Sequence, residues 1–235
     1  MRSFLLLLLC LIASNLYAQV DVPVLEPSEI IMLPNTNLEE CHRVVHKAST
    51  DYNSLTDVEK ALYGFIVEDS VLAHFYSGNC SWYCGGQIDS VTASSALGEK
   101  YAAEKAHDFS IVTAWVEGVE GNGEGEYIKY AFPGTCPRIT TVLIHNGYVK
   151  NWDVWSDNGR VQRLLMYYND KPYVILHLQD TANLQSFEVG ILGNEVRSQT
   201  SPAWSIKFEI LEVYPGEKYE DTAITEIYFD GIDVH

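Results

Sequence analysis

A short loop around Asp108 carries residue types suited to holding a metal ion. Asp108 precedes Thr113 by five positions, and Trp115 follows closely. A carboxylate and a hydroxyl thus share one compact loop, next to a large ring that can anchor it. Calcium takes oxygen ligands of these kinds together with backbone carbonyls, so the pattern predicts a calcium site. The competing interpretation is an ordinary polar turn capped by Asp108.

A second group of residues has the chemistry of a sugar-binding surface. Aromatic faces stack on the C–H surfaces of sugars, and amide, carboxylate and guanidinium groups bond their hydroxyls. The candidates are Trp82, Tyr83, Glu117, Asn122, Glu124, Asn146, Tyr148, Trp152, Trp155, Asn158 and Arg160. The competing interpretation is that several of these rings belong to the core, where Trp115 and Tyr127 are also expected. Arg160 would then stabilise the structure through an ion pair with Glu117 or Glu124.

Other chemistries find little support. The glycine-rich run 118–125 lacks the lysine of a P-loop, and its surrounding glutamates would repel phosphate, so we expect a flexible loop beside the binding face. A zinc site at Cys41, His42 and His46 lacks the glutamate of a zinc-protease helix. No nucleophile motif is present, so we predict no enzyme. A hydrolase is a third alternative, and its acids would come from Glu117, Glu124 and Glu126.

The N-terminus and the composition indicate an exported, acidic protein. Residues 1–18 contain Arg2 and an apolar run from Phe4 to Ala13, as in a secretory signal peptide cleaved near Ala18. That run is shorter than the about 20 residues needed to span a bilayer. The formal net charge is −17, which disfavours nucleic acid and anionic membranes as partners. Neutral glycans and bound cations fit better.

Four cysteines remain after cleavage, and an even number in an exported chain favours disulfides. They are Cys41, Cys80, Cys84 and Cys136. We expect Cys41 to pair with Cys80 or Cys84, and the other member of that pair to bond Cys136. Such bonds would tie the front segment to the following domain.

The pattern of elements changes near Gln87. Residues 19–35 should be extended on the surface, and helical periodicity predicts helices at 36–50 and 56–74, the second opened by a capping box at Thr56 and Glu59. Beyond Gln87, short β-branched and aromatic segments alternate with turns, which is typical of an antiparallel sandwich. The expected strands cover 126–132, 139–145, 161–168, 173–179, 185–191, 204–214 and 224–229, with a hairpin turn at 168–171. The expected division is therefore a signal peptide (1–18), a helical, disulfide-tethered segment (19–86) and a β domain (87–235).

Four stretches in this order carry a family resemblance: YAAEKAHDFSIVTAW, EGNGEGEYI, HNGYVKNWDVWSDNGRV and KYEDTAITEIYFDG. They resemble the discoidin, or coagulation factor 5/8 type C, family of galactose-binding-like jelly rolls. The most similar subgroup is the glycan-binding domain resembling the translocation domain of streptococcal NAD glycohydrolase. The resemblance covers residues 87–235 and implies a mainly β, jelly-roll sandwich there, behind a short α-helical N-terminal segment.

The resemblance also implies a ligand set for calcium. The side chains of Asp108 and Glu226, the hydroxyl and carbonyl of Thr113, and carbonyls near Lys105 and Ser110 would hold the ion. Lys105 stands where the family usually has asparagine, and Phe109-Ser110 replaces a glycine and an acid. Backbone carbonyls must therefore serve at those positions.

From residues and resemblance together we expect a secreted, lectin-like module that binds a glycan or glycoconjugate without catalysis and contains a structural calcium ion. The alternative is a protein–protein interaction module of a cell-envelope assembly, with Trp152 and Trp155 as anchors. Nucleic acid and membrane insertion are not expected.

Overall fold

The computed structural model describes residues 22–32, 38–68 and 82–234. The expected signal peptide and Cys80 lie outside these ranges. Within them, no helix combines the length and apolar character needed to cross a membrane.

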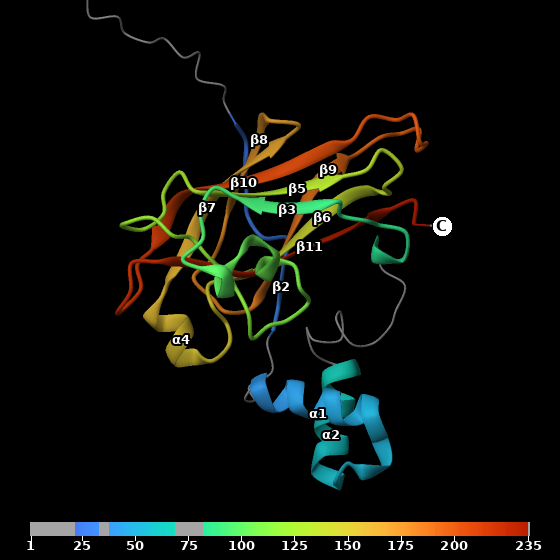
Figure 1. Ribbon diagram of the computed structural model, residues 1–235, viewed down its shortest axis with the longest axis vertical. Helices are drawn as coiled ribbons and strands as arrows, with labels where there is room; N and C mark the ends of the chain where they lie inside the picture. Colours follow the sequence, from blue (N-terminus) through green and yellow to red (C-terminus); the bar gives the residue numbers. More distant parts are fainter. Residues whose placement is uncertain (1–21, 33–37, 69–81, 235) are drawn as a thin grey trace, which may run out of the picture.

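The chain is mainly β (Figure 1). Its strands are β1 Val24–Leu25, β2 Glu29–Ile31, β3 Ser90–Ala93, β4 Trp115–Val116, β5 Tyr127–Phe132, β6 Arg138–Asn146, β7 Gly159–Tyr168, β8 Lys171–His177, β9 Leu184–Leu192, β10 Trp204–Tyr214 and β11 Thr222–Ile232. The α-helices are α1 Leu38–Asp51, α2 Asp57–Glu68 and α4 Trp152–Asp157, and short 3-10 turns are η1 Tyr52–Ser54, η2 Trp82–Cys84, η3 Glu99–Tyr101 and η4 Ala103–Ala106.

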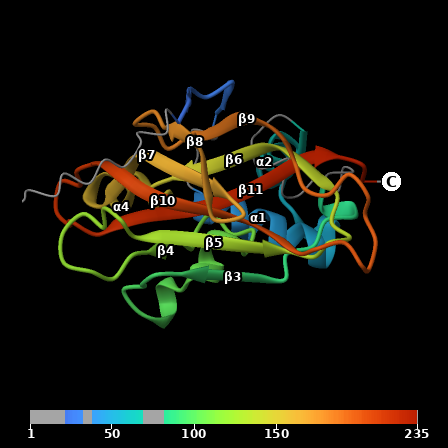
Figure 2. The same cartoon turned by 90° about the horizontal axis from the view of Figure 1, so that it is seen from above.

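The strands form a jelly-roll sandwich in which β11 joins the two halves. The strand order is β2-β9-β6-β11-β7-β10-β5-β3, with β8 beside β7 and β4 beside β11. The later part of β11, from Glu226 onward, pairs with β6, whereas its first residues, Thr222 and Ala223, run parallel to β7. Figure 2 shows β3, β5 and β10 following one another across the molecule, with β6 and β9 on the other side of β11.

The core lies between these halves. Inward-facing positions alternate along β5 and β10, as period-two patterning requires. Phe132 stacks on Trp204 with ring centroids 4.2 Å apart, and Phe229 of β11 packs edge-on against Phe132 at 5.3 Å. One buried cluster thus contains side chains from both halves, which fixes their packing.

The helical expectations are confirmed for the described residues. Glu59 Nα donates to Thr56 Oγ1 and the Glu59 carboxylate accepts from Thr56 N, which is the expected capping box. Arg43 and Lys47 of α1 both pair with Glu59, at 2.8 Å each, and join the two helices. Residues 69–74 of the expected second helix lie outside the described ranges.

The hairpin turn is confirmed, since Asn169 and Asp170 both adopt positive φ, as a type I′ turn requires. The seven expected strands are all present, with ends displaced by at most a few residues. The N-terminal segment is extended and at the surface, as expected. The sequence did not indicate its pairing: Val24 and Leu25 pair with β8, and Glu29–Ile31 pair with β9. Strands this short carry no readable alternation, and the open edges of the sheet decide their pairing.

The expected disulfides are not formed among the described cysteines. Cys41 and Cys136 are both buried free thiols. Because either expected arrangement needs each of these two cysteines in a disulfide, the predicted pairing is wrong for this structure. Burial raises the pKa of the Cys41 thiol to about 11, so this thiol is unreactive at neutral pH.

Candidate functional site

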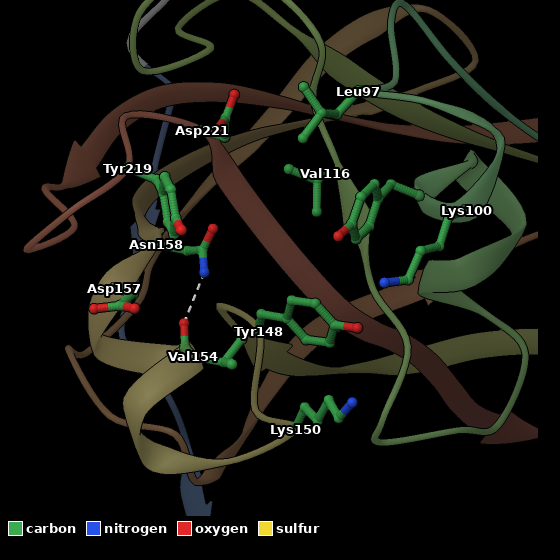
Figure 3. A pocket seen from close by; sticks show the side chains of 11 residues that line it. Leu97, Lys100, Val116, Tyr148, Lys150, Val154, Asp157, Asn158, Tyr219 and Asp221 are labelled. Carbon is green, nitrogen blue, oxygen red and sulfur yellow. Dashed lines mark hydrogen bonds between the residues drawn. The ribbon is translucent and has the colours of Figure 1, made fainter.

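One pocket lies where three connections meet at an end of the sandwich (Figure 3). The connections are the η3 region, the segment from Tyr148 through α4, and the loop before β11; Val116 of β4 completes the wall. The pocket encloses about 380 Å³. It is lined by Leu97, Lys100, Tyr101, Val116, Tyr148, Lys150, Val154, Asp157, Asn158, Tyr219 and Asp221.

The wall made by α4 and the loop before β11 is held by backbone hydrogen bonds. Asn151 caps α4 by accepting from Val154 N at 2.9 Å. The N–H groups of Lys218 and Tyr219 both donate to the carbonyl of Asp157. At Gly216 a Cβ atom would lie 2.5 Å from that same carbonyl oxygen, so only glycine permits this approach.

The floor of the pocket depends on the turn after β6. Gly147 has φ +78°, and a Cβ there would lie 2.5 Å from Arg160 Cγ and 2.9 Å from the Trp155 ring. This turn directs Tyr148 into the pocket, where its ring meets Tyr101 edge-on at 6.3 Å. The Tyr148 hydroxyl donates to the Val112 carbonyl at 3.1 Å. Burial raises the pKa of Tyr148, against the lowering effect of the Lys100 charge, so the hydroxyl stays a donor.

The polar groups of the pocket are divided by sign of charge. Figure 3 shows Lys100 and Lys150 on one side, and Asp157, Asn158, Tyr219 and Asp221 on the other. The Asn158 side-chain amide donates to the Val154 carbonyl at 2.8 Å, which leaves its oxygen available for a ligand. Hydroxyl-rich molecules need this mixture of rings, donors and acceptors.

Of the residues expected to bind ligand, Tyr148 and Asn158 lie in the pocket. Trp82, Glu117 and Asn146 are fully buried, which corrects their expected exposure. Trp82 belongs to the core and donates to the Pro137 carbonyl at 3.1 Å. Asn146 exchanges two hydrogen bonds with the backbone of Val161, at 2.7 and 2.9 Å, and so fastens β6 to β7. Tyr83 packs against the core, and its hydroxyl accepts from Phe229 N at 3.0 Å.

Arg160 is also a correction, because it fastens the structure through a partner that the sequence did not indicate. Its guanidinium makes two hydrogen bonds to Asp180, at 3.0 and 2.9 Å, in place of the expected Glu117 or Glu124. It donates further to the carbonyls of Asn158 and Pro215 and lies 4.8 Å from the centroid of the Trp155 ring. All of these contacts are internal, so Arg160 supports the pocket wall from behind.

The glycine-rich loop is fastened, which corrects the expectation of a flexible loop. The Glu117 carboxylate accepts from Val119 N at 2.9 Å and from Thr222 N at 3.1 Å, and burial raises its pKa. Thr222 Oγ1 donates to the carbonyl of Asn122. The side chains of Asn122 and Glu124 point to solvent but line no described pocket.

The two tryptophans of α4 differ in exposure. Trp155 is half-buried and donates to the Asn146 carbonyl at 3.0 Å. Trp152 is 57% exposed and packs edge-on against Trp155 with centroids 6.2 Å apart. Of the two expected anchors, Trp152 is therefore the one that presents its ring to solvent.

The expected metal residues come together on the other side of Tyr148. Asp108 Oδ1 accepts from Thr113 Oγ1 at 2.7 Å, and Glu226 Oε1 accepts from Ser110 N at 2.8 Å. Phe109, with φ +59°, turns the loop between them. Lys105 Nζ lies 3.1 Å from Asp108 Oδ2, so a cation of the protein already contacts one carboxylate.

Glu226 is fully buried, and its environment disfavours a bare negative charge. Burial raises its pKa well above 4.5, the hydrogen bond from Ser110 opposes this, and the charge of Asp108 raises it further. Glu226 Oε2 is buried and receives no hydrogen bond from a donor among the described residues. A carboxylate with an orphaned oxygen beside a second carboxylate is suited to a cation.

This donor set fits calcium better than a transition metal. Within the described ranges no cluster of three or more His, Cys, Asp or Glu side chains could hold a metal. Calcium can complete six to eight oxygen ligands with hydroxyls, carbonyls and water around two carboxylates. Asp108, Thr113, Ser110 and Glu226 supply such oxygens, so the residues present fit the ion.

The sequence signal for the pocket was weak. Lys100, Tyr101, Lys150, Tyr219 and Asp221 lie in three separate connections, and nothing in their spacing joins them. The available signal was Asn151 followed by Asp153, a cap and a first-turn acid that predict a helix. Recognising α4 would have placed Asp157 and Asn158 at the end of a helix, beside the following strand.

The sequence matches none of the curated proteins with which it was compared. Among solved structures it is similar to the CBM32-1, CBM32-2 and M60 catalytic domains of Clostridium perfringens ZmpB, at 12% identity and a TM-score of 0.48 over 84% of this chain and 21% of that one. In the ZmpB structure of CBM32-1 and CBM32-2 with GalNAc, the similarity covers 83% of this chain and 50% of that one, at 12% identity and a TM-score of 0.48. This chain thus spans from about a fifth to half of the length of these structures.

A further similar structure is chitosan-binding module 2 from a chitosanase/glucanase of Paenibacillus sp. IK-5, in complex with chitotriose, at 9% identity and a TM-score of 0.40 over 63% of this chain and 99% of that one. The family comparison covers more than half of the chain, from residue 82 to residue 230. This region contains the pocket, the Asp108 loop, strands β3 to β10 and most of β11. The match shows that the chain belongs to the NAD glycohydrolase translocation F5/8 type C domain family.

Proposed function

We propose that this protein is an exported, non-catalytic module that binds a glycan in the pocket beside α4. The observation that carries the proposal is the lining of that pocket. Tyr101, Tyr148 and Tyr219 offer rings to a sugar face, while Asn158 and Asp221 offer acceptors for hydroxyls. A volume of about 380 Å³ is near the small end of ligand pockets and suits one or two sugar units.

The test is a titration of the mature protein with simple sugars and disaccharides, followed by calorimetry and by the thermal unfolding midpoint. Tyr219→Ala should weaken binding about 3- to 10-fold, because an exposed stacking ring is removed. Tyr219 is 44% exposed, so its loss should leave the fold intact. Tyr52→Ala, a similarly exposed ring on η1 away from the pocket, is the matched control. If no sugar binds the folded protein with calcium present, the proposal is wrong.

The second part of the proposal is a structural calcium ion. Asp108, Thr113, Ser110 and Glu226 would hold it, and the ion would supply the positive charge that the buried Glu226 carboxylate lacks. Lys105 would release Asp108 when calcium enters. The support is the pair of carboxylates, the orphaned Glu226 Oε2 and the positive φ of Phe109. The test compares thermal unfolding of the protein with calcium and with EDTA.

A protein-binding function is the second candidate, and the exposed ring of Trp152 favours it. Aromatic side chains of this kind anchor interfaces when they enter a partner's pocket. Trp152→Ala should abolish capture of an envelope protein partner while leaving sugar binding and the unfolding midpoint unchanged. Capture that competing sugars reverse would favour the glycan proposal instead.

A further inference from the structure

The two sides of the pocket differ in charge, and this difference bears on which glycan it accepts. Lys100 lies on η3, two residues after the Gly98 cap. Lys150 comes two residues after Tyr148, beyond the turn that directs Tyr148 into the pocket. Both are lining residues, and in Figure 3 the Tyr148 hydroxyl lies between their ammonium groups. Asp157 and Asp221 line the opposite side. The lining therefore presents a cationic side and an acidic side to one small ligand.

Lys100 lacks the carboxylate partner that several other described lysines of this acidic chain have. The sequence has 15 basic and 32 acidic residues, so a lysine generally finds a carboxylate nearby. Such pairs are seen for Lys105 with Asp108, Lys129 with Asp170, and Lys207 with Glu209. Among the described residues, Lys100 makes no comparable ion pair. Its Nζ lies 5.1 Å from the centroid of the Tyr101 ring, and its charge acts on the Tyr148 hydroxyl at the pocket floor.

We infer that the pocket binds a sugar carrying a carboxylate, with the carboxylate facing Lys100 and Lys150 and the hydroxyls facing Asp157, Asn158 and Asp221. This inference rests on the proposed glycan-binding function and specifies its ligand class. A carboxylate between two ammonium groups forms charge-assisted hydrogen bonds, which are stronger than those of a neutral hydroxyl. The acidic side accepts hydroxyl protons, and the tyrosine rings cover the ring face of the sugar.

A singly charged anion fits this lining better than a dianion. Lys100 and Lys150 offset Asp157 and Asp221 in the lining, and Lys218 lies 3.9 Å from Asp157, so one added negative charge is tolerated where it meets the two lining lysines. A phosphate monoester would bring nearly two charges close to Asp157 and Asp221, in a protein of net charge −17. Repulsion from the acidic side would oppose such a ligand.

The experiment compares pairs of sugars that differ only at one carbon. Methyl galacturonoside is titrated against methyl galactoside, and methyl glucuronoside against methyl glucoside, by calorimetry with calcium present. N-acetylneuraminate tests whether the carboxylate comes from a sialic acid, and glucose 6-phosphate tests a dianion. We expect one carboxylate sugar to bind about tenfold tighter than its neutral partner, with the preference falling as salt is raised.

The variants place this preference in the pocket. Lys100→Met and Lys150→Met should each reduce the ratio of carboxylate-sugar affinity to neutral-sugar affinity several-fold, and Lys100→Arg should retain that ratio. Lys171→Met is the matched control, because Lys171 is an exposed lysine at the start of β8, outside the pocket lining. Unfolding midpoints equal to that of the parent protein show that the variants are folded.

The outcomes separate this inference from the proposed function. Equal binding of carboxylate and neutral sugars overturns the inference and leaves the glycan-binding function standing. A preference that survives both methionine variants, or tighter binding of the phosphate, overturns it as well. If no sugar of either kind binds, both proposals fail.

Discussion

Glu226 should make the calcium-free protein less stable as the pH rises, and calcium should remove this effect. The folded-state pKa of Glu226 is raised above 4.5, chiefly by burial. Its contribution to the free energy of unfolding is therefore fully present below a pH of about 4.5, the ordinary pKa of glutamate. That contribution is lost as the pH rises through the folded-state pKa. With EDTA present, the free energy of unfolding should include a component that falls between acidic and neutral pH.

Bound calcium should remove this dependence because it would favour the ionised form of both carboxylates. At a free calcium concentration of 100 times Kd, binding adds about 2.7 kcal/mol to the free energy of unfolding. For a chain of this size, that corresponds to an increase of about 5 to 10 °C in Tm. Lys105→Met should tighten calcium binding, since its ammonium group no longer competes for Asp108.

The assay is thermal unfolding across pH 5 to 8, with calcium and with EDTA, in the parent protein and in Glu226→Gln. The amide has no charge to bury, so Glu226→Gln with EDTA should match or exceed the parent in stability at neutral pH and should not respond to calcium. Glu124→Gln, which changes an exposed carboxylate, should behave as the parent. A calcium response of full size in Glu226→Gln would refute this reasoning.

Three further predictions concern the pocket and its support. Gly147→Ala should lower the free energy of unfolding, measured with urea, by about 1–3 kcal/mol, because Gly147 has a positive φ and the new Cβ would contact Arg160. Gly98→Ala is the control and should be nearly neutral, because nothing lies within 4 Å of its new Cβ. Arg160→Met should lower the free energy of unfolding by about 2–3 kcal/mol in the same assay. This value is smaller than that of a fully buried ion pair because the Asp180 side chain is 38% exposed. An unchanged unfolding midpoint would contradict the structural role of the Arg160–Asp180 pair. Tyr148→Phe keeps the ring but removes the hydroxyl, so sugar affinity measured by calorimetry should depend less on calcium than in the parent protein. An undiminished dependence would contradict this link.

Much of the fold could be predicted because the alternation of apolar and polar residues along a strand indicates which of its faces is buried. Ile206, Phe208 and Ile210 alternate with polar residues and face the core, as that pattern requires. The capping box at Thr56 and Glu59 is equally local, and it is formed. By contrast, the two-residue β4 and the N-terminal β1 and β2 are too short for any period, and their pairing depends on neighbours that are distant in sequence.

The site was harder to predict because residue type does not determine which way a loop side chain points. Trp82, Asn146 and Arg160 have sugar-binding chemistry, yet each satisfies internal contacts that only the tertiary structure creates. The Asp108 loop is different, since five residues bring its carboxylate and the Thr113 hydroxyl to 2.7 Å with no help from distant segments. A long-range partner such as Glu226 could be named from the family resemblance and not from spacing.

The pocket and the Asp108 loop are physically connected, and this connection would give the proposed calcium ion a role in ligand binding. The Tyr148 ring forms the pocket floor, while its hydroxyl bonds the carbonyl of Val112, the neighbour of Thr113. β11 makes a second connection, because Asp221 just before it lines the pocket and Glu226 within it meets Ser110. An ion that orders the loop would therefore hold the floor in place before a sugar arrives. Since such coupling is reciprocal, a sugar bound over Tyr148 should also tighten calcium binding by the same factor.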